Sequence, residues 1–189
     1  MQALLKQIQK ELQASSTSEA KTAALKFVPG ATKVYGIRTP VLNVLAKKYK
    51  EGGFELIKEL WAAGAFEEQL LAAKMLREVC KKNPELAVSI VNNFSKNIAD
   101  WAVCDTVGMQ SLKPVAKKME KEIFDLSANL IKSKNLWQRR LSLVLIEVFT
   151  KDKSLHPEIM KRVKMLEDDE EYHVKKAVVW IRRNIEKAR

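Results

Sequence analysis

Trp101 and Asp105 are the residues whose types and spacing most suggest chemistry. Four positions apart on a helix, they share one face and place an aromatic plane beside a carboxylate. Such a pair can stabilise a developing positive charge. Taken alone, it is more simply explained as a packed aromatic and an exposed or capping acid. Residues further along the chain favour a site.

Tryptophans and cations recur after this pair. Lys176, Trp180 and Arg183 follow the i, i+4, i+7 rule and share a helix face. Trp137 begins its helix, and we expect it to wedge two structural repeats together rather than to contact a ligand. The remaining candidates are basic residues predicted to line the same surface: Arg139, Arg140, Lys175 and Lys176.

The elements that position these residues are predicted to be helical hairpins in series. Apolar residues recur at spacings of three and four, strand-like alternation is absent, and the fold class is therefore all-α. Equivalent first-helix positions are separated by 33, 36 and 35 residues: Glu68, Trp101, Trp137 and Tyr172. This period is typical of HEAT-like α-solenoids, which form an α-α superhelix with a concave groove. We expect one such domain over residues 1–189, with the candidate residues in a basic groove.

Helix boundaries follow from capping and breaking residues. Thr17 or Ser18 is expected to cap a second helix, Thr39 to cap the helix that begins at Pro40, and Asn83 to cap the one that begins at Pro84. The expected helices are 1–12, 18–28, 40–52, 54–61, 66–82, 84–94, one from 100, 117–131, 136–150, 157–166 and a last one that carries Trp180.

The charge balance favours a polyanionic partner. The chain has 34 Lys and Arg against 23 Asp and Glu, a net charge of +11. The excess is spread over both halves, so no basic tail accounts for it. A folded surface of this kind favours nucleic acid over membrane, because no separate basic amphipathic arm is present. Simple solubility is the alternative explanation.

Composition excludes several classes of protein. Hydrophobic residues at 47% and charged residues at 30% exclude a disordered chain, and no apolar run approaches the roughly 18 residues of a membrane span. The N-terminus has no signal-peptide pattern, so we expect a cytoplasmic protein. Cys80 and Cys104, with only His156 and His173 beside them, support neither a disulfide nor a metal site, and both cysteines are expected to be buried and reduced.

Four segments occur in a particular order along nearly the whole chain. They are Tyr35-Gly36-Ile37-Arg38-Thr39-Pro40, Trp101-x-x-x-Asp105, Asn135-Leu136-Trp137-Gln138-Arg139-Arg140, and the stretch from Lys175 to Arg183. Together they resemble the DNA alkylation repair family of HEAT-like DNA glycosylases. Asp100 stands before Trp101 where some family members have a second aromatic residue, and Val179 stands before Trp180 where glycine is the common choice. These departures predict a bulkier groove edge. The chain also ends at Arg189, where longer relatives continue, so we expect one groove wall to be lower.

The resemblance implies an activity and a set of roles. Trp101 and Trp180 correspond to the family's groove aromatics, Asp105 to its catalytic carboxylate, and Arg140 to an arginine of the active site and DNA backbone. The implied function is base excision repair by a monofunctional, monomeric hydrolase that acts at the bacterial nucleoid. It would release cationic N3- or N7-alkylpurines from double-stranded DNA, leave an abasic site, use no cofactor or metal, and hold the lesion in an open groove without a base pocket.

Two other functions stay open. A non-catalytic DNA-binding member of the same fold would recognise damaged or branched DNA, but it would need no carboxylate among the phosphates. An α-solenoid scaffold would bind acidic peptides with little salt-dependent affinity for DNA. Asp105 is the residue that separates the enzyme from both.

Overall fold

The computed structural model describes residues 2–188, and these are all-helical, without strands, as predicted. The α-helices are α1 (Gln2–Ala14), α2 (Ser18–Phe27), α3 (Thr39–Lys48), α4 (Gly53–Ala63), α5 (Phe66–Val79), α6 (Pro84–Phe94), α7 (Trp101–Gln110), α8 (Glu120–Leu130), α9 (Leu136–Leu145), α10 (His156–Met165) and α11 (Tyr172–Lys187). Short 3-10 helices are η1 (Lys50–Gly52), η2 (Cys80–Lys82), η3 (Ser95–Asn97), η4 (Lys113–Val115), η5 (Glu147–Phe149) and η6 (Lys153–Leu155). None of the described helices has the length and apolarity required to cross a membrane.

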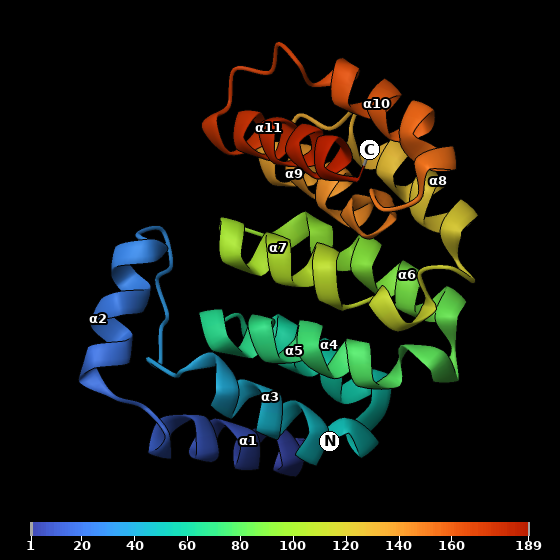
Figure 1. The fold of residues 1–189 in the computed structure, drawn as a ribbon. Coiled ribbons are helices and arrows are strands. Elements are labelled where there is room, and N and C mark those ends of the chain that lie inside the picture. The colour runs from blue at the N-terminus through green and yellow to red at the C-terminus, as the bar shows by residue number, and fades with distance from the viewer. Residues whose placement is uncertain (1, 189) are drawn as a thin grey trace.

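The helices form an α-α superhelix of two layers (Figure 1). In one layer α3, α5, α7, α9 and α11 pack side by side in chain order. The other layer contains α4, α6, α8 and α10, with α1 against α4. The predicted equivalent positions therefore all fall in the first turns of helices of the first layer.

Side-chain caps set the helix starts where the sequence predicts them. Thr17, Asn83 and Asp100 accept hydrogen bonds from backbone N–H groups three residues ahead, at the starts of α2, α6 and α7. The prediction for Thr39 was wrong by one residue: Arg38 is the cap residue, and Thr39 is the first residue of α3.

Three predicted helix ends were several residues too late. Helices α3, α5 and α9 stop at Lys48, Val79 and Leu145, and the segments that follow them contain the 3-10 helices η1, η2 and η5. A 3-10 turn keeps an i, i+3 apolar spacing, so periodicity does not mark this change. Helix α8 also begins later than predicted, at Glu120.

Gly108 allows α7 and α9 to approach closely. A Cβ at this position would lie 2.6 Å from Val144 Cγ1 and 2.9 Å from Val144 Cβ, closer than carbon atoms can pack. Any larger residue would therefore force the two helices apart. The contact lies one turn beyond Asp105, and it fixes the distance from Asp105 to the residues of α9.

Two buried carboxylates of α5 hold the segment that begins at Tyr35. Glu67 Oε1 accepts from the N–H groups of Gly36 (2.7 Å) and Ile37 (3.2 Å), and Oε2 accepts from that of Tyr35 (2.9 Å). Glu68 accepts from the Tyr35 hydroxyl and the Ala65 N–H. Burial, followed by the nearby charge of Glu68, raises the pKa of Tyr35 to about 12. The geometry of this segment depends on Gly36, whose φ is +90°.

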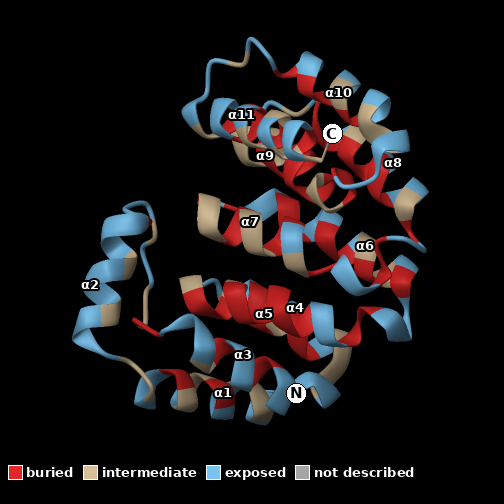
Figure 2. Cartoon of the chain, viewed as in Figure 1, coloured by how far each residue is buried: buried red, intermediate tan, exposed pale blue. Residues whose placement is uncertain are grey.

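Helix α2 differs from the rest of the structure in its exposure. It contributes no buried residue, whereas the other helices bury a face in the core between the layers (Figure 2). In Figure 1 it stands apart, opposite the first turns of α5 and α7. Cys80 and Cys104 are buried and free, as predicted.

Candidate functional site

The first turns of α7 present Trp101 and Asp105. Asp100 begins the helix as its N-cap, accepting from the Val103 N–H at 2.8 Å, and burial raises the pKa of this carboxyl. The Trp101 indole Nε1 donates to the Phe27 carbonyl at 2.9 Å, which joins α7 to the end of α2. The residue that departs from the family pattern at position 100 is therefore a helix cap, and Trp101 is oriented by α2.

Asp105 forms a bidentate ion pair with Arg140 of α9. Arg140 Nε donates to Oδ1 at 2.9 Å, and Nη2 donates to Oδ2 at 2.8 Å. A third bond runs from Arg140 Nη1 to the His173 carbonyl at the start of α11. Arg140 thus connects three successive helices of one layer. Its side chain is 8% exposed against 22% for Asp105, so the carboxylate is the member of the pair that is open to solvent.

The electrostatics of this cluster follow from burial and from the ion pair. Burial disfavours the charge of Arg140, but the hydrogen bonds that Arg140 donates to Asp105, together with the Asp105 charge, outweigh burial and raise the pKa of the guanidinium. Burial and the Arg140 charge lower the pKa of His173. Burial raises the pKa of Cys104 far above its usual value, so this thiol is no nucleophile. Each Asp105 oxygen accepts one bond from Arg140 and keeps a lone pair for another partner.

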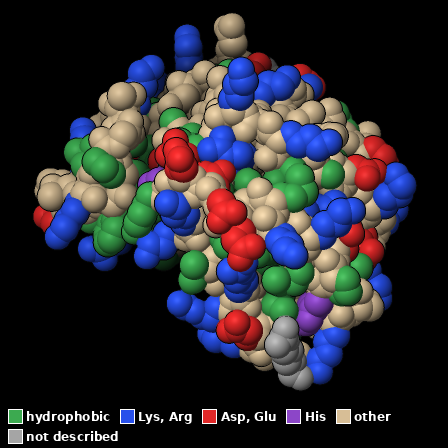
Figure 3. Space-filling view, turned by 90° about the horizontal axis from the view of Figure 1, so that it is seen from above, with side chains coloured by type: hydrophobic (Ala, Val, Ile, Leu, Met, Phe, Trp, Pro, Cys, Tyr) green, Lys and Arg blue, Asp and Glu red, His purple; other side chains and the backbone are tan. Residues whose placement is uncertain are grey.

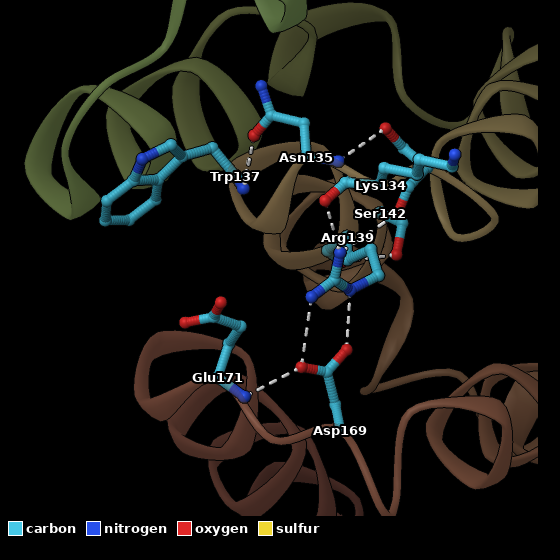
Figure 4. Close-up of polar contacts among 8 residues, drawn as sticks. Lys134, Asn135, Trp137, Arg139, Ser142, Asp169 and Glu171 are labelled. Carbon is cyan, nitrogen blue, oxygen red and sulfur yellow. Dashed lines mark hydrogen bonds and ion pairs between the residues drawn. The ribbon is translucent and has the colours of Figure 1, made fainter.

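Arg139 forms the same kind of pair in a different place. Its Nε and Nη2 donate to the two oxygens of Asp169 at 2.6 and 3.2 Å, and its Nη1 donates to the carbonyls of Ser133 and Lys134 (Figure 4). Asp169 also accepts from the Glu171 N–H. Four of the five N–H donors of Arg139 are engaged within the protein, which leaves one for another partner.

Trp137 lies between two repeats. Its ring centroid is 4.9 Å from that of His173 on α11, and its side chain packs partly on the core. Its backbone N–H donates to the Asn135 side chain, which caps α9. The contact with the following repeat is the one predicted for this residue.

The remaining candidates lie on α11. Lys175, Lys176 and Arg183 are exposed, and Lys176 Nζ lies 5.3 Å from the centre of the Tyr172 ring. Trp180 packs partly against the core and lies seven residues from His173, about 10 Å along the helix. The structure thus joins Asp105 to Arg140 directly, with Trp101 one turn earlier on α7 and Trp180 two turns along α11.

Two residues of this region were not predicted. His173 contributes its backbone carbonyl to Arg140, and no sequence signal marks a carbonyl group. Lys74 is buried in α5 and lines a groove beside Trp101. A signal for Lys74 exists, since it is the one charged residue within the apolar run from Leu70 to Leu76.

Lys and Arg side chains are distributed widely over the face of the molecule shown in Figure 3, with acidic side chains among them. Within residues 2–188, no group of three or more His, Cys, Asp or Glu side chains is placed to hold a metal ion.

The fold and these side chains define a class: an α-α superhelix in which successive helices of one layer present a carboxylate, an arginine and partly exposed tryptophans. The sequence matches the family model described as DNA alkylation repair enzyme over residues 8–189. The match covers nearly the whole chain, and the protein therefore belongs to this family. No protein with a curated description matches the chain.

Proposed function

We propose that the protein is a monofunctional DNA glycosylase, active as a monomer, that releases cationic N3- or N7-alkylpurines from double-stranded DNA. Membership of the DNA alkylation repair family supports DNA as the substrate. The observation that carries the proposal is the orientation of the Asp105–Arg140 pair, in which the arginine is buried and the carboxylate is open to solvent.

The reaction requires the protein to stabilise a positive charge on the sugar and to orient a water molecule. When the C1′–N bond of an alkylated purine breaks, the bonding electrons neutralise the cationic base, and the sugar becomes an oxocarbenium ion. Asp105 stabilises this charge through its free lone pairs and orients the attacking water. Water forms the C1′–O bond and releases a proton, and the product is an abasic site with the strand intact. Neither a metal ion nor an amine nucleophile takes part in this sequence.

The other candidate residues bind the DNA in this proposal. Trp101 and Trp180 pack on the cationic sugar and the adjacent backbone. Lys175, Lys176 and Arg183 are exposed on α11 and contact phosphates. Arg139 and Arg140 contribute through the N–H donors that their carboxylate and carbonyl partners leave free, one in Arg139 and two in Arg140.

The test is excision of N7-methylguanine from duplex DNA by matched variants. Asp105→Asn keeps the shape and removes the charge, so excision should fall roughly 10²-fold or more while DNA binding survives or improves. Asp169→Asn is the matched control, because it removes the same charge from the neighbouring arginine pair. It should retain excision per folded molecule. Equal excision by Asp105→Asn and the parent would remove the carboxylate from the mechanism.

DNA binding is measured separately, by titration at several salt concentrations. Affinity should fall steeply with salt, and Lys176→Gln should reduce the log-log slope by about one if this lysine neutralises one phosphate. An affinity independent of salt would contradict DNA as the partner and favour a protein scaffold.

A second candidate function has one observation in its favour. Because Arg140 neutralises Asp105, the carboxylate does not leave an uncompensated negative charge in the groove. A non-catalytic protein that recognises damaged or branched DNA could therefore keep this residue. Salt-dependent binding without excision by the parent protein would select this function.

A further inference from the structure

A groove of about 740 Å³ separates α2 from the first layer, beside Trp101. Its volume is within the range of small-molecule sites. Most of its wall is apolar, and its members come from α2, the start of α3, α5 and α7, among them Phe27, Phe66, Leu70, Lys74, Trp101 and Gln110. Asp105 does not line the groove, so its chemistry is separate from that of the ion pair.

Lys74 is a buried cation in the wall of this groove. It is 6% exposed, and its Nζ donates to Asn43 Oδ1 at 2.8 Å and to Gln110 Oε1 at 3.1 Å. Both partners are neutral amides, and none of the ion pairs among residues 2–188 includes Lys74. A buried charge without a counter-ion is costly, which is consistent with the lowered pKa that burial and then Arg77 give this amine.

The hydrogen bonds of Lys74 determine what a ligand would meet. An ammonium group only donates, so the amide of Gln110 must turn its oxygen toward Lys74 and its NH₂ group away. The third N–H of Lys74 is also left to donate. Gln110 and Lys74 therefore keep N–H donors without a partner among these bonds, and a ligand that satisfies these donors must be an acceptor. An anion would also supply the missing counter-charge.

Phe27 and Trp101, which also line the groove, suit a flat apolar group. Phe27 is 66% exposed, and its carbonyl holds the Trp101 indole through the 2.9 Å hydrogen bond. The charges of Glu19 and Arg38, which interact at the rim, offset one another. Lys74 is then the net charge of the lining, and Phe27 is the large hydrophobic residue of the lining that is exposed.

We propose that this groove binds one nucleotide of the DNA strand, with the phosphate on Lys74 and Gln110 and the base against Phe27 and Trp101. A nucleotide combines the two properties that the groove selects, an anion and a flat aromatic ring. The identity of the strand rests on the proposed function: the nucleotide is a neighbour of the one whose sugar lies at Asp105. Aromatic side chains hold unstacked bases in this way without reading their sequence.

The experiment compares three probes by NMR titration of the full chain: deoxyadenosine monophosphate, deoxyadenosine and inorganic phosphate. The monophosphate should bind at least about tenfold more tightly than either part. Lys74→Gln should lower its affinity about tenfold, to that of deoxyadenosine, since a charged hydrogen bond is removed. Phe27→Ala should lower it to a similar extent by removing a stacking partner. Lys74→Arg keeps the charge and should bind more tightly than Lys74→Gln.

Controls separate this proposal from general charge effects and from the glycosylase. Lys117→Gln makes the same charge change at an exposed residue outside the groove and should bind the monophosphate like the parent. Equal affinity for monophosphate and inorganic phosphate would overturn the proposal, as would parent-like binding by Phe27→Ala, an exposed site that does not endanger folding. Octanoate binding as tightly as the monophosphate would overturn it in favour of an aliphatic ligand. None of these measurements requires excision, so each proposal can fail alone.

Discussion

Two consecutive arginines of α9 each hold a carboxylate with two hydrogen bonds, and the two pairs are buried in opposite senses. In the Arg139–Asp169 pair the carboxylate is 7% exposed and the arginine 17%. In the Arg140–Asp105 pair the arginine is 8% exposed and the carboxylate 22%. The carboxylate is therefore the more buried member of the Arg139–Asp169 pair and the more exposed member of the Arg140–Asp105 pair.

This difference distinguishes a structural ion pair from the one that belongs to the candidate site. Asp169 is surrounded by Arg139 and the Glu171 N–H, and it ties the segment before α11 to α9. Among residues 2–188, Asp105 accepts side-chain hydrogen bonds from Arg140, and 22% of its side chain stays exposed to solvent. Burial of the arginine, rather than the presence of an ion pair, marks the candidate site.

Removal of Arg140 should have the largest effect on stability. Arg140→Ala leaves a partly buried carboxylate and the His173 carbonyl without their donor, so the free energy of unfolding should fall by about 3 kcal/mol. For a chain of this size that corresponds to a decrease in Tm of about 10 °C. Thermal unfolding of Arg140→Ala, Asp105→Ala and the double variant measures the coupling, and additive effects would contradict a direct pair.

Moving α7 away from α9 should weaken the Asp105–Arg140 ion pair although neither of its residues is substituted. Gly108→Ala places a Cβ against Val144, which should cost about 2 kcal/mol and reduce excision as the helices move apart. Gly30→Ala is the control, since nothing lies within 4 Å of a Cβ there. If Gly108→Ala keeps full stability and excision, the close approach has no role in placing Asp105.

Loss of Arg139 should affect stability and leave the chemistry intact. Arg139→Ala should lower the free energy of unfolding by about 1–2 kcal/mol, because it removes charged hydrogen bonds to Asp169. Its effect on the salt dependence of DNA binding should be at most that of one phosphate, a slope change of about 0.9. Excision per folded molecule should match the parent, and a tenfold decrease would show that the two pairs do not differ in function.

The smallest effect should come from His173, whose carbonyl accepts from Arg140 and whose ring packs against Trp137. Its pKa is lowered in the folded protein by burial and by Arg140, with Asp105 and Glu171 acting in the opposite direction. The unfolded chain therefore binds a proton near pH 6.5 and the folded protein only at lower pH, so this stability is complete above pH 6.5 and lost as pH falls. Urea unfolding at pH 7 and 5 should show a smaller loss in His173→Gln, by under about 1 kcal/mol.

Much of the architecture could be predicted from the sequence. Glu68, Trp101, Trp137 and Tyr172 lie on successive helices of one layer, as their spacing predicts. The spacing equals the number of residues in one helical hairpin, and this number does not depend on which side chains the hairpin carries. Helix starts at Thr17, Asn83 and Asp100 were predictable because a cap is a local bond. The spacing of Trp101 and Asp105 places both on one helix face.

The pairing of charges could not be predicted. Arg139 and Arg140 are adjacent in sequence, yet about 100° of helix rotation sends them to carboxylates on different elements. Asp169 lies in an irregular segment 30 residues away, so no periodicity relates it to Arg139. The approach that brings Arg140 to Asp105 depends on Gly108 and Val144 together, a property of two helices rather than of either sequence.

The buried carboxylate of Glu67 should change how the N-terminal end of this protein unfolds. Arrays of repeats generally unravel from their ends, because each unit touches only its neighbours. Here a fully buried carboxylate accepts from three N–H groups of a segment about 30 residues earlier, and release of this segment would leave the carboxylate buried without these donors. The end helices should thus open together with α5, and the amides of Gly36 and Ile37 should exchange hydrogen as slowly as those of the core, although they lie in a loop.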